Sequence, residues 1–139
     1  MSDESRYYRF MDTLRELTQT MLVRFTQIDY DREMALVATI PGEDGKEKQI
    51  GVARYVVNPD GESVEFALAV GDDWQKCGVG RKLMTALVDC ARQKGYRAVV
   101  GDVLSSNSKM FRLMTSLGFS IHPHPDDTAV KRVVKPLTG

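Results

Sequence analysis

Residues 75–81 read QKCGVGR and contain the residue types that bind phosphate. They follow an apolar run that ends near residue 70 and precede an amphipathic stretch that starts near Leu83, so they should join a strand to a helix. Backbone N–H groups at the start of such a helix carry the positive end of its dipole and can bind an anion. Gly78 and Gly80 would let the backbone approach a pyrophosphate where a Cβ would intrude.

Lys76, Arg81 and Lys82 add positive charge to this segment, in a chain whose formal net charge is zero. Two familiar phosphate loops do not fit. The Walker loop ends in Gly-Lys-Ser/Thr, whereas this segment ends in Gly80 followed by two other basic residues. The dinucleotide fingerprint needs a third glycine where Leu83 stands. A tight turn between a strand and a helix, with no ligand, is the alternative interpretation of the same pattern.

Glu65 is the side chain that we expect to act as a general base. It lies ten residues before Gln75 on the strand predicted for Ser63–Val70, between the apolar residues Val64 and Phe66. An apolar setting strengthens a carboxylate as a base, which could then accept a proton from an amine. Alternation along the strand leaves a second interpretation open, in which Glu65 lies on a solvated face of the sheet.

The composition restricts the class of protein. The chain has 139 residues with 19 basic and 19 acidic side chains, so it fits one domain and lacks the overall positive charge of a dedicated nucleic-acid binder. No apolar run approaches the roughly 18 residues that span a membrane, and residues 1–10 lack the apolar core of a signal peptide. Its two cysteines, Cys77 and Cys90, suit a reducing compartment. We therefore expect a single cytoplasmic domain over residues 1–139.

Two other chemistries are weaker interpretations. Cys77 could be an acyl-carrying nucleophile, but no histidine lies near it in the sequence, and direct transfer from a thioester needs no covalent intermediate. Residues 122–127 read HPHPDD and resemble a short metal-binding cluster, but the prolines interrupt regular structure and no further ligands converge there. We therefore expect no metal.

The elements that position these residues follow from hydrophobic periodicity and turn signals. Asn58–Gly61 should turn a hairpin, and Lys94 followed by Gly95 should end the helix after the phosphate loop. The predicted elements, in chain order, are helices over the first 30 residues, strands at 34–40, 49–57 and 63–70, a helix from about 80 to 94, a strand at 96–103, a helix at 107–117 and strands near 119–122 and 128–134. This order predicts an α/β domain with a mixed, largely antiparallel twisted sheet of about six to seven strands flanked by helices.

The pattern Gln75-x-x-Gly78-x-Gly80, placed between a strand and an amphipathic helix, resembles the acyl-CoA loop of the GNAT superfamily of N-acetyltransferases. Asn107, Leu113 and residues 117–119 (LGF) resemble the helix that closes the pantetheine side of that fold.

Three further segments are similar to the GNAT domain of Pat-type bacterial protein lysine acetyltransferases. They are residues 26–37, 51–55 and 65–67, and the resemblance extends from about Ser5 to Leu137. It implies transfer of an acetyl group from acetyl-CoA to an amine, with a protein lysine as the acceptor and acyl-CoA synthetases as candidate substrate proteins. A small-molecule amine acetyltransferase and a non-catalytic acyl-CoA sensor are the alternatives.

The resemblance also implies roles for individual residues. It makes Glu65 the catalytic glutamate, because the family's glutamate occupies the same strand. It implies acyl-CoA contacts for Leu68, Ala69, Val70, Gln75, Lys76, Cys77, Gly78, Val79, Gly80, Arg81, Lys82 and Asn107. Asn107 also suits the N-cap of its own helix, and the two roles can coexist.

Two departures from the family pattern matter. Many GNAT enzymes place a tyrosine seven residues after the asparagine as an acid for the departing thiolate, and Met114 stands there in this chain. We therefore name no general acid. Pat-type proteins commonly carry a large acyl-CoA-synthetase-like domain, which 139 residues cannot hold. The chain is thus expected to be an excised domain or a stand-alone relative.

Overall fold

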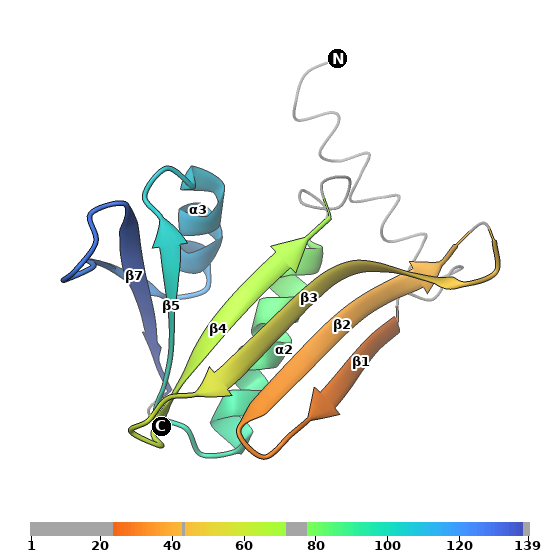
Figure 1. The fold of residues 1–139 in the computed structure, drawn as a ribbon, viewed down its shortest axis with the longest axis horizontal. Helices are drawn as coiled ribbons and strands as arrows, with labels where there is room; N and C mark the ends of the chain where they lie inside the picture. Colours follow the sequence, from red (N-terminus) through yellow and green to blue (C-terminus); the bar gives the residue numbers. More distant parts are fainter. Residues whose placement is uncertain (1–23, 43, 72–77, 138–139) are drawn as a thin grey trace.

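The computed structural model describes residues 24–42, 44–71 and 78–137, which form a seven-stranded sheet and two helices (Figure 1). The strands lie in the order β1-β2-β3-β4-β5-β7-β6 across the sheet. Neighbouring strands are antiparallel except for β4 and β5, which are parallel. The predicted mixed, largely antiparallel sheet is therefore confirmed.

The bounds of the elements agree closely with the sequence prediction from residue 33 onward. The strands are β1 (Arg24–Asp29), β2 (Glu33–Pro41), β3 (Glu47–Val57), β4 (Ser63–Val70), β5 (Ala98–Leu104), β6 (Ser120–Pro123) and β7 (Val130–Pro136), and the helices are α2 (Val79–Gln93) and α3 (Ser108–Ser116).

The turn between β3 and β4 forms where the sequence predicts it. The N–H of Gly61 donates to the carbonyl of Asn58 at 2.9 Å, and Gly61 has a positive φ of 69°. The carboxylate of Asp60 accepts hydrogen bonds from the backbone N–H groups of Glu62 and Ser63. These bonds hold the pKa of Asp60 below its ordinary value. The turn fixes the register of β4, and with it the positions of the candidate site residues.

Helix α2 covers one face of the sheet. Its buried residues recur at helical spacing and pack against β2, β3, β4 and β5; they are Val79, Gly80, Leu83, Met84, Leu87, Val88 and Ala91. The helix ends at Lys94 and Gly95, and Gly95 takes a positive φ of 86° as predicted. Among the described residues, no helix is long and apolar enough to cross a membrane.

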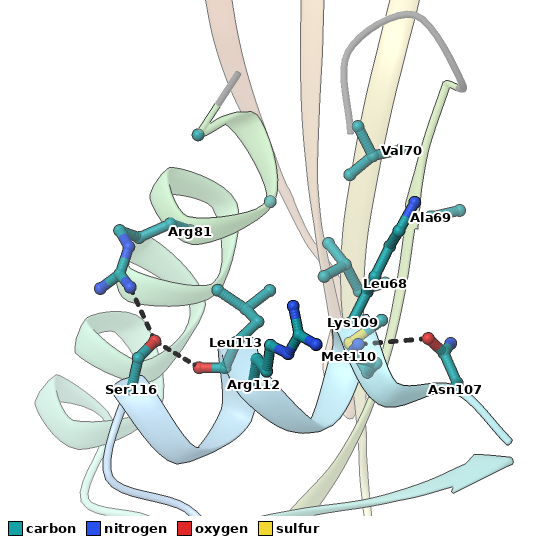
Figure 2. A pocket seen from close by; sticks show the side chains of 12 residues that line it. Leu68, Ala69, Val70, Arg81, Asn107, Lys109, Met110, Arg112, Leu113 and Ser116 are labelled. Carbon is teal, nitrogen blue, oxygen red and sulfur yellow. Dashed lines mark hydrogen bonds between the residues drawn. The ribbon is translucent and has the colours of Figure 1, made fainter. Parts of the chain in front are cut away.

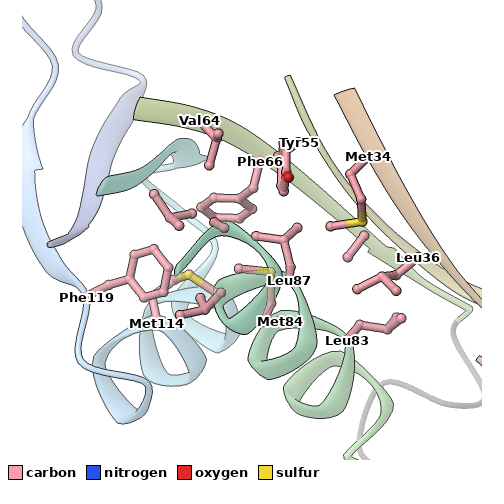
Figure 3. Close-up of a cluster of buried hydrophobic side chains, with 14 of the residues drawn as sticks. Met34, Leu36, Tyr55, Val64, Phe66, Leu83, Met84, Leu87, Met114 and Phe119 are labelled. Atoms are coloured by element: carbon pink, nitrogen blue, oxygen red, sulfur yellow. The ribbon is translucent and has the colours of Figure 1, made fainter. Parts of the chain in front are cut away.

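The core lies between α2, α3 and the face of the sheet that they cover (Figure 3). Alternate residues of each strand point into it: on β4, Val64 and Phe66 are buried whereas Glu65 and Ala67 are exposed. Phe66 meets the edge of Phe119 at a centroid distance of 5.7 Å. The alternation means that β4 presents different side chains to the two faces of the sheet.

One sequence prediction is wrong. The spacing of Phe25 and Ile28 was expected to continue a helix, but residues 24–29 form strand β1, which pairs with β2 from Arg24 opposite Thr39 to Asp29 opposite Met34. Four antiparallel strands therefore precede α2 among the described residues, where three were predicted. The hydrogen bonds that residues 24–29 gain by pairing with the edge of β2 favour a strand over the helix that the weak apolar spacing predicted. The helices predicted before residue 24 lie outside the described residues.

Candidate active site

Strands β4 and β5 separate partway along their length, and the site lies where they separate. They pair in parallel over three residues, from Ser63 opposite Ala98 to Glu65 opposite Val100. Beyond Glu65, β4 pairs with β3 as far as Val70, whereas β5 turns away (Figure 1). The edge of β4 that faces β5 therefore has peptide groups beyond Glu65 that can meet a ligand in place of a neighbouring strand.

A cleft of about 750 Å³ occupies this gap, between the end of β4, the start of α2 and one face of α3 (Figure 2). It is lined by Leu68, Ala69, Val70, Gly78, Gly80, Arg81, Asn107, Lys109, Met110, Arg112, Leu113 and Ser116. The cleft combines an apolar wall from β4 with backbone from a helix start and with basic side chains. That combination suits a long ligand with an apolar arm and an anionic end.

The start of α2 forms one end of the cleft. Gly78 is its N-cap with φ of 81°, a left-handed conformation that glycine adopts without strain, and it supplies no side-chain cap. A Cβ on Gly80 would lie 3.6 Å from side-chain carbons of Leu113, Leu68 and Val70, three residues that also line the cleft. The helix therefore brings its backbone and the positive end of its dipole directly to the cleft.

Three basic side chains line the same cleft: Arg81 from α2, and Lys109 and Arg112 from α3. Arg81 donates from its guanidinium to the hydroxyl of Ser116 at 2.7 Å, and that hydroxyl donates to the carbonyl of Leu113 at 2.7 Å (Figure 2). None of the three cations forms an ion pair within the described part of the chain. Their charge is thus available to an anionic ligand.

Asn107 lies at the other end of the cleft. Its side-chain oxygen accepts a hydrogen bond from the backbone N–H of Met110 at 3.1 Å, so it caps α3. It also lines the cleft. The N-cap role anticipated from the sequence is confirmed, and its remaining hydrogen-bonding capacity faces the same space as the start of α2.

The structure brings together most of the residues predicted to contact acyl-CoA. Leu68, Ala69, Val70, Gly78, Gly80, Arg81 and Asn107 line the cleft. Val79 and Lys82 do not, because the side chain of Val79 is buried in the core and that of Lys82 is exposed beside the cleft on α2. Gln75, Lys76 and Cys77 lie outside the described residues.

Lys109, Arg112 and Ser116 were not assigned to the site from the sequence. They are spaced three and four residues apart along α3, and therefore lie on one face of the helix. That spacing was the available signal. The spacing shows that the three side chains share one face of α3, but it does not show which part of the protein that face lies against.

Glu65 lies on the opposite face of β4 from the core. It is exposed, and it lines a second hollow of about 340 Å³ together with Arg54, Val56, Phe66, Ala67 and Asp102. Glu65 is also the last residue of β4 that pairs with β5. The solvated-face interpretation of its position is therefore confirmed. Leu68, which lines the cleft, follows Glu65 by three residues on the same strand.

Asp102 contributes a second carboxylate to this hollow. Arg132 donates to it from Nε at 3.3 Å, and Nε2 of His124 lies 3.9 Å from its other oxygen. His124 was considered above as part of a metal cluster. Among the residues that the structure describes, no group of three or more His, Cys, Asp or Glu side chains is arranged to hold a metal ion.

Met114 is fully buried in the core, with Phe119 (Figure 3). It does not line the cleft, whereas Met110, one turn earlier on α3, does. The position at which many GNAT enzymes carry a tyrosine is thus used for packing here.

Comparisons with known proteins agree with this geometry. The profile of the acetyltransferase (GNAT) family matches residues 3–119. Acetyltransferase PA5475 of Pseudomonas aeruginosa is 33% identical over 128 residues, which cover 92% of this chain and 68% of that protein. Acetyltransferase Pat of Mycolicibacterium smegmatis is 33% identical over 118 residues, which cover 84% of this chain but only 34% of that protein.

A solved structure gives the same result. The crystal structure of the GNAT domain of S. lividans PAT has a TM-score of 0.67 and 27% sequence identity, covering 98% of this chain and 78% of that one. The sheet, the cleft and the sequence match therefore lead to one conclusion: the chain belongs to the acetyltransferase (GNAT) family and is an acetyl-CoA-dependent N-acetyltransferase.

Proposed function

We propose that the chain transfers the acetyl group of acetyl-CoA to a lysine side chain of a protein, with Glu65 as the general base. The observation that carries the proposal is the position of β4. Leu68 and Val70 of this strand line the cleft on one face of the sheet, and Glu65 lines the hollow on the other. Ala67 lines the hollow and Leu68, the next residue, lines the cleft, and both lie beyond the last pair of β4 with β5, so a thioester held on one side would meet an amine from the other.

The cleft would hold acetyl-CoA. The backbone N–H groups at Gly78 and Gly80 would bind the pyrophosphate, assisted by Arg81, and Lys109 and Arg112 would neutralise further phosphate charge. Peptide groups of Leu68–Val70 would hold the pantetheine arm and the thioester carbonyl, where a hydrogen-bond donor would stabilise the developing oxyanion. Asn107 would contact the pantetheine. Contacts with acyl-CoA also stay predicted for Val79, Lys82 and residues 75–77. They would act through their backbone N–H groups or their positive charge.

Glu65 would prepare the acceptor. A lysine with an ordinary pKa of about 10.4 is neutral in only about one molecule in two thousand at pH 7, so the amine must lose a proton before it can attack. Glu65 would take this proton directly or through a water molecule, which its exposed position permits. The amine nitrogen then bonds to the thioester carbon, the carbon–sulfur bond breaks, CoA leaves as its thiolate, and the nitrogen releases its second proton to water. Met114 cannot protonate the thiolate, so water would do so.

The acceptor protein is the part of the proposal that rests on resemblance. Pat-type enzymes, which this chain resembles, are protein lysine acetyltransferases, and acyl-CoA synthetases are the substrate proteins that we propose to test. We further propose that residues 1–139 act as one GNAT domain in the cytoplasm. The family profile spans residues 3–119, and β7 extends the same sheet as far as Pro136.

The test uses radiolabelled acetyl-CoA with candidate acyl-CoA synthetases, comparing the natural protein with Glu65→Gln and with Glu62→Gln. We expect labelled protein, a loss of kcat of about 10²- to 10⁴-fold in Glu65→Gln, and unchanged binding of CoA. Glu62 is a matched control, because it is an exposed glutamate in the neighbouring turn. Full activity of Glu65→Gln would remove the general-base role. Binding of CoA without turnover in any variant would instead indicate a sensor.

A small-molecule amine is the second candidate acceptor. The observation in its favour is the volume of the hollow beside Glu65, about 340 Å³, which suffices for a small amine. Release of CoA in the presence of small amines, with no label on any protein, would establish this alternative.

A further inference from the structure

The hollow beside Glu65 contains charged groups whose roles the proposed reaction does not explain. Its walls come from three strands: Arg54 and Val56 from β3, Glu65 to Ala67 from β4, and Asp102 from β5. All the charged side chains among them lie on the face of the sheet opposite to α2. An acceptor in the hollow would interact mainly with those charged groups that have no partner within the protein.

The charge of Asp102 is already compensated. Nε of Arg132 donates to one of its oxygens at 3.3 Å, and the imidazole of His124 lies 3.9 Å from the other. Arg132 is the direct partner of Asp102 in the pairing of β5 with β7, so the backbone holds the two side chains on the same face. Asp102 is therefore paired with a cation from β7, the neighbouring strand on the side of β5 away from β4.

Arg54 and Glu65 have no such partners. Within the described residues, neither side chain forms an ion pair or a side-chain hydrogen bond. Glu65 lies opposite Val56, and Arg54 lies opposite Ala67, so the two charged residues are diagonal neighbours on one face of the β3–β4 pair. Diagonal neighbours are roughly 7–8 Å apart at their Cα atoms.

This arrangement gives the hollow one carboxylate and one guanidinium that are neighbours but do not form an ion pair with each other within the described residues. A protonated amine on its way to Glu65 would meet the carboxylate, but it would be repelled by Arg54. An acceptor that carries a carboxylate near its amine would satisfy both groups. Arginine suits such a carboxylate because its planar guanidinium can donate two parallel hydrogen bonds.

We infer that Arg54 is a specificity-determining residue that selects acceptor lysines with an aspartate or glutamate nearby. The inference rests on the proposed acetylation of protein lysines. Arg54 would bind the acidic side chain of the substrate peptide and so hold the lysine amine over Glu65. It takes no part in proton transfer or acyl transfer.

The experiment uses peptides with one central lysine, flanked by glutamate, by glutamine or by lysine, and measures kcat/KM for the natural protein, Arg54→Gln, Arg54→Glu and Arg97→Gln. We expect the natural protein to prefer the glutamate-flanked peptide by about 10- to 100-fold, mainly through KM, because one charge-assisted contact is gained. Arg54→Gln should remove this preference, and Arg54→Glu should reverse it toward the lysine-flanked peptide. Arg97, an exposed arginine at the start of the β5 region, is the control that should keep it.

The reversal is informative because loss of structure in Arg54→Glu would lower activity toward all peptides alike. Calorimetric titration of the same peptides into the CoA-saturated protein measures the preference without turnover. Equal affinity of the natural protein for all the peptides, or a preference that Arg54→Gln retains, would overturn the inference.

A parallel assay with L-lysine and with its decarboxylated counterpart separates this inference from the proposed function. If no peptide is acetylated but the carboxylate-bearing small amine is preferred in an Arg54-dependent manner, the protein-lysine proposal fails and the role of Arg54 stands. If peptides are acetylated without regard to flanking charge, the role of Arg54 fails and the proposed function stands.

Discussion

The guanidinium of Arg81, at the start of α2, donates a hydrogen bond to the hydroxyl of Ser116, at the end of α3, across 2.7 Å (Figure 2). The hydroxyl of Ser116 in turn donates a hydrogen bond to the carbonyl of Leu113 at 2.7 Å. The contact joins two helices that both line the cleft, and it holds a positive charge there that forms no ion pair with any carboxylate of the described residues. Because a neutral hydroxyl oxygen accepts from Arg81, the charge of the guanidinium stays available to a phosphate group of the ligand.

We predict that Arg81→Ala lowers the affinity for acetyl-CoA by about 10- to 100-fold, because a charge-assisted contact with phosphate is lost. Ser116→Ala should have a smaller effect of a few-fold, since the cation stays but its orientation is less restricted. Calorimetry with CoA measures both. Arg92→Ala is the control, because Arg92 lies on the same helix, exposed and paired with Asp89. Equal affinities of Arg81→Ala and the control would refute the assignment of Arg81 to the ligand.

Gly80→Ala should separate binding from stability. A Cβ at this position would be 3.6 Å from its nearest neighbours, which is ordinary van der Waals contact, so the fold should accept it. Alanine is favoured over glycine in helices by up to about 1 kcal/mol, and the first turn should gain a fraction of this. The added methyl group projects among side chains that line the cleft, so we expect the KM for acetyl-CoA to rise about tenfold. Urea denaturation and steady-state kinetics on one preparation check the two effects.

Much of the fold could be predicted because its signals are local. The bounds of β4 follow from the turn at Asn58–Gly61 and the apolar run after it, and the end of α2 follows from Lys94 and Gly95. Strand β1 could not be predicted in this way, because Phe25 and Ile28 are half-exposed residues whose spacing fits a helix as well as a strand. Residues 24–29 form a strand because they pair with β2, and the local spacing of apolar residues does not reveal such pairing with another segment.

The site could be predicted only where it coincides with a motif. The glycines at the start of α2 and Asn107 belong to recognisable patterns, whereas Arg112 enters the site through the packing of α3 against the rest of the domain. Glu65 was identified by its strand, but alternation could not decide which face it occupies. The role inferred for Arg54 depends on that face and on the register of β3 with β4, neither of which the sequence specifies directly.

Gly101→Ala should destabilise the protein without reaching the cleft. A Cβ at this position would lie 2.4 Å from a ring carbon of Phe66, so the ring would have to move. Phe66 is buried between β5 and Phe119, and overpacking of this kind costs about 1–3 kcal/mol. In a double-mutant cycle, Gly101→Ala should cost less in a Phe66→Leu background than in the natural protein. Additive effects on the free energy of unfolding would show that the ring is not the obstacle.

The ion pair between Lys94 and Asp29 should contribute stability only within a defined range of pH. Nζ of Lys94 lies 2.6 Å from a carboxylate oxygen of Asp29, which joins the end of α2 to β1. The hydrogen bond from Lys94 lowers the pKa of Asp29 below its ordinary value of 3.8, and the same bond raises the pKa of Lys94 above 10.5. A lowered carboxylate pKa stabilises the folded state above pH 3.8, and this is lost as the pH falls through the folded-state value. A raised lysine pKa stabilises it below pH 10.5, and this is lost as the pH rises through the folded-state value.

Lys94→Met should therefore reduce the free energy of unfolding most between about pH 5 and 9, with the difference from the natural protein shrinking toward pH 3 and toward pH 11.5. Both groups are partly exposed, so 1 M NaCl should also shrink the difference at pH 7 by screening the pair. Urea denaturation across this pH range provides the measurement. Lys48→Met, which removes an exposed lysine on β3, should show no such pH dependence. A difference that is constant from pH 3 to 11.5 would mean that Lys94 stabilises the end of α2 by packing and not by its charge.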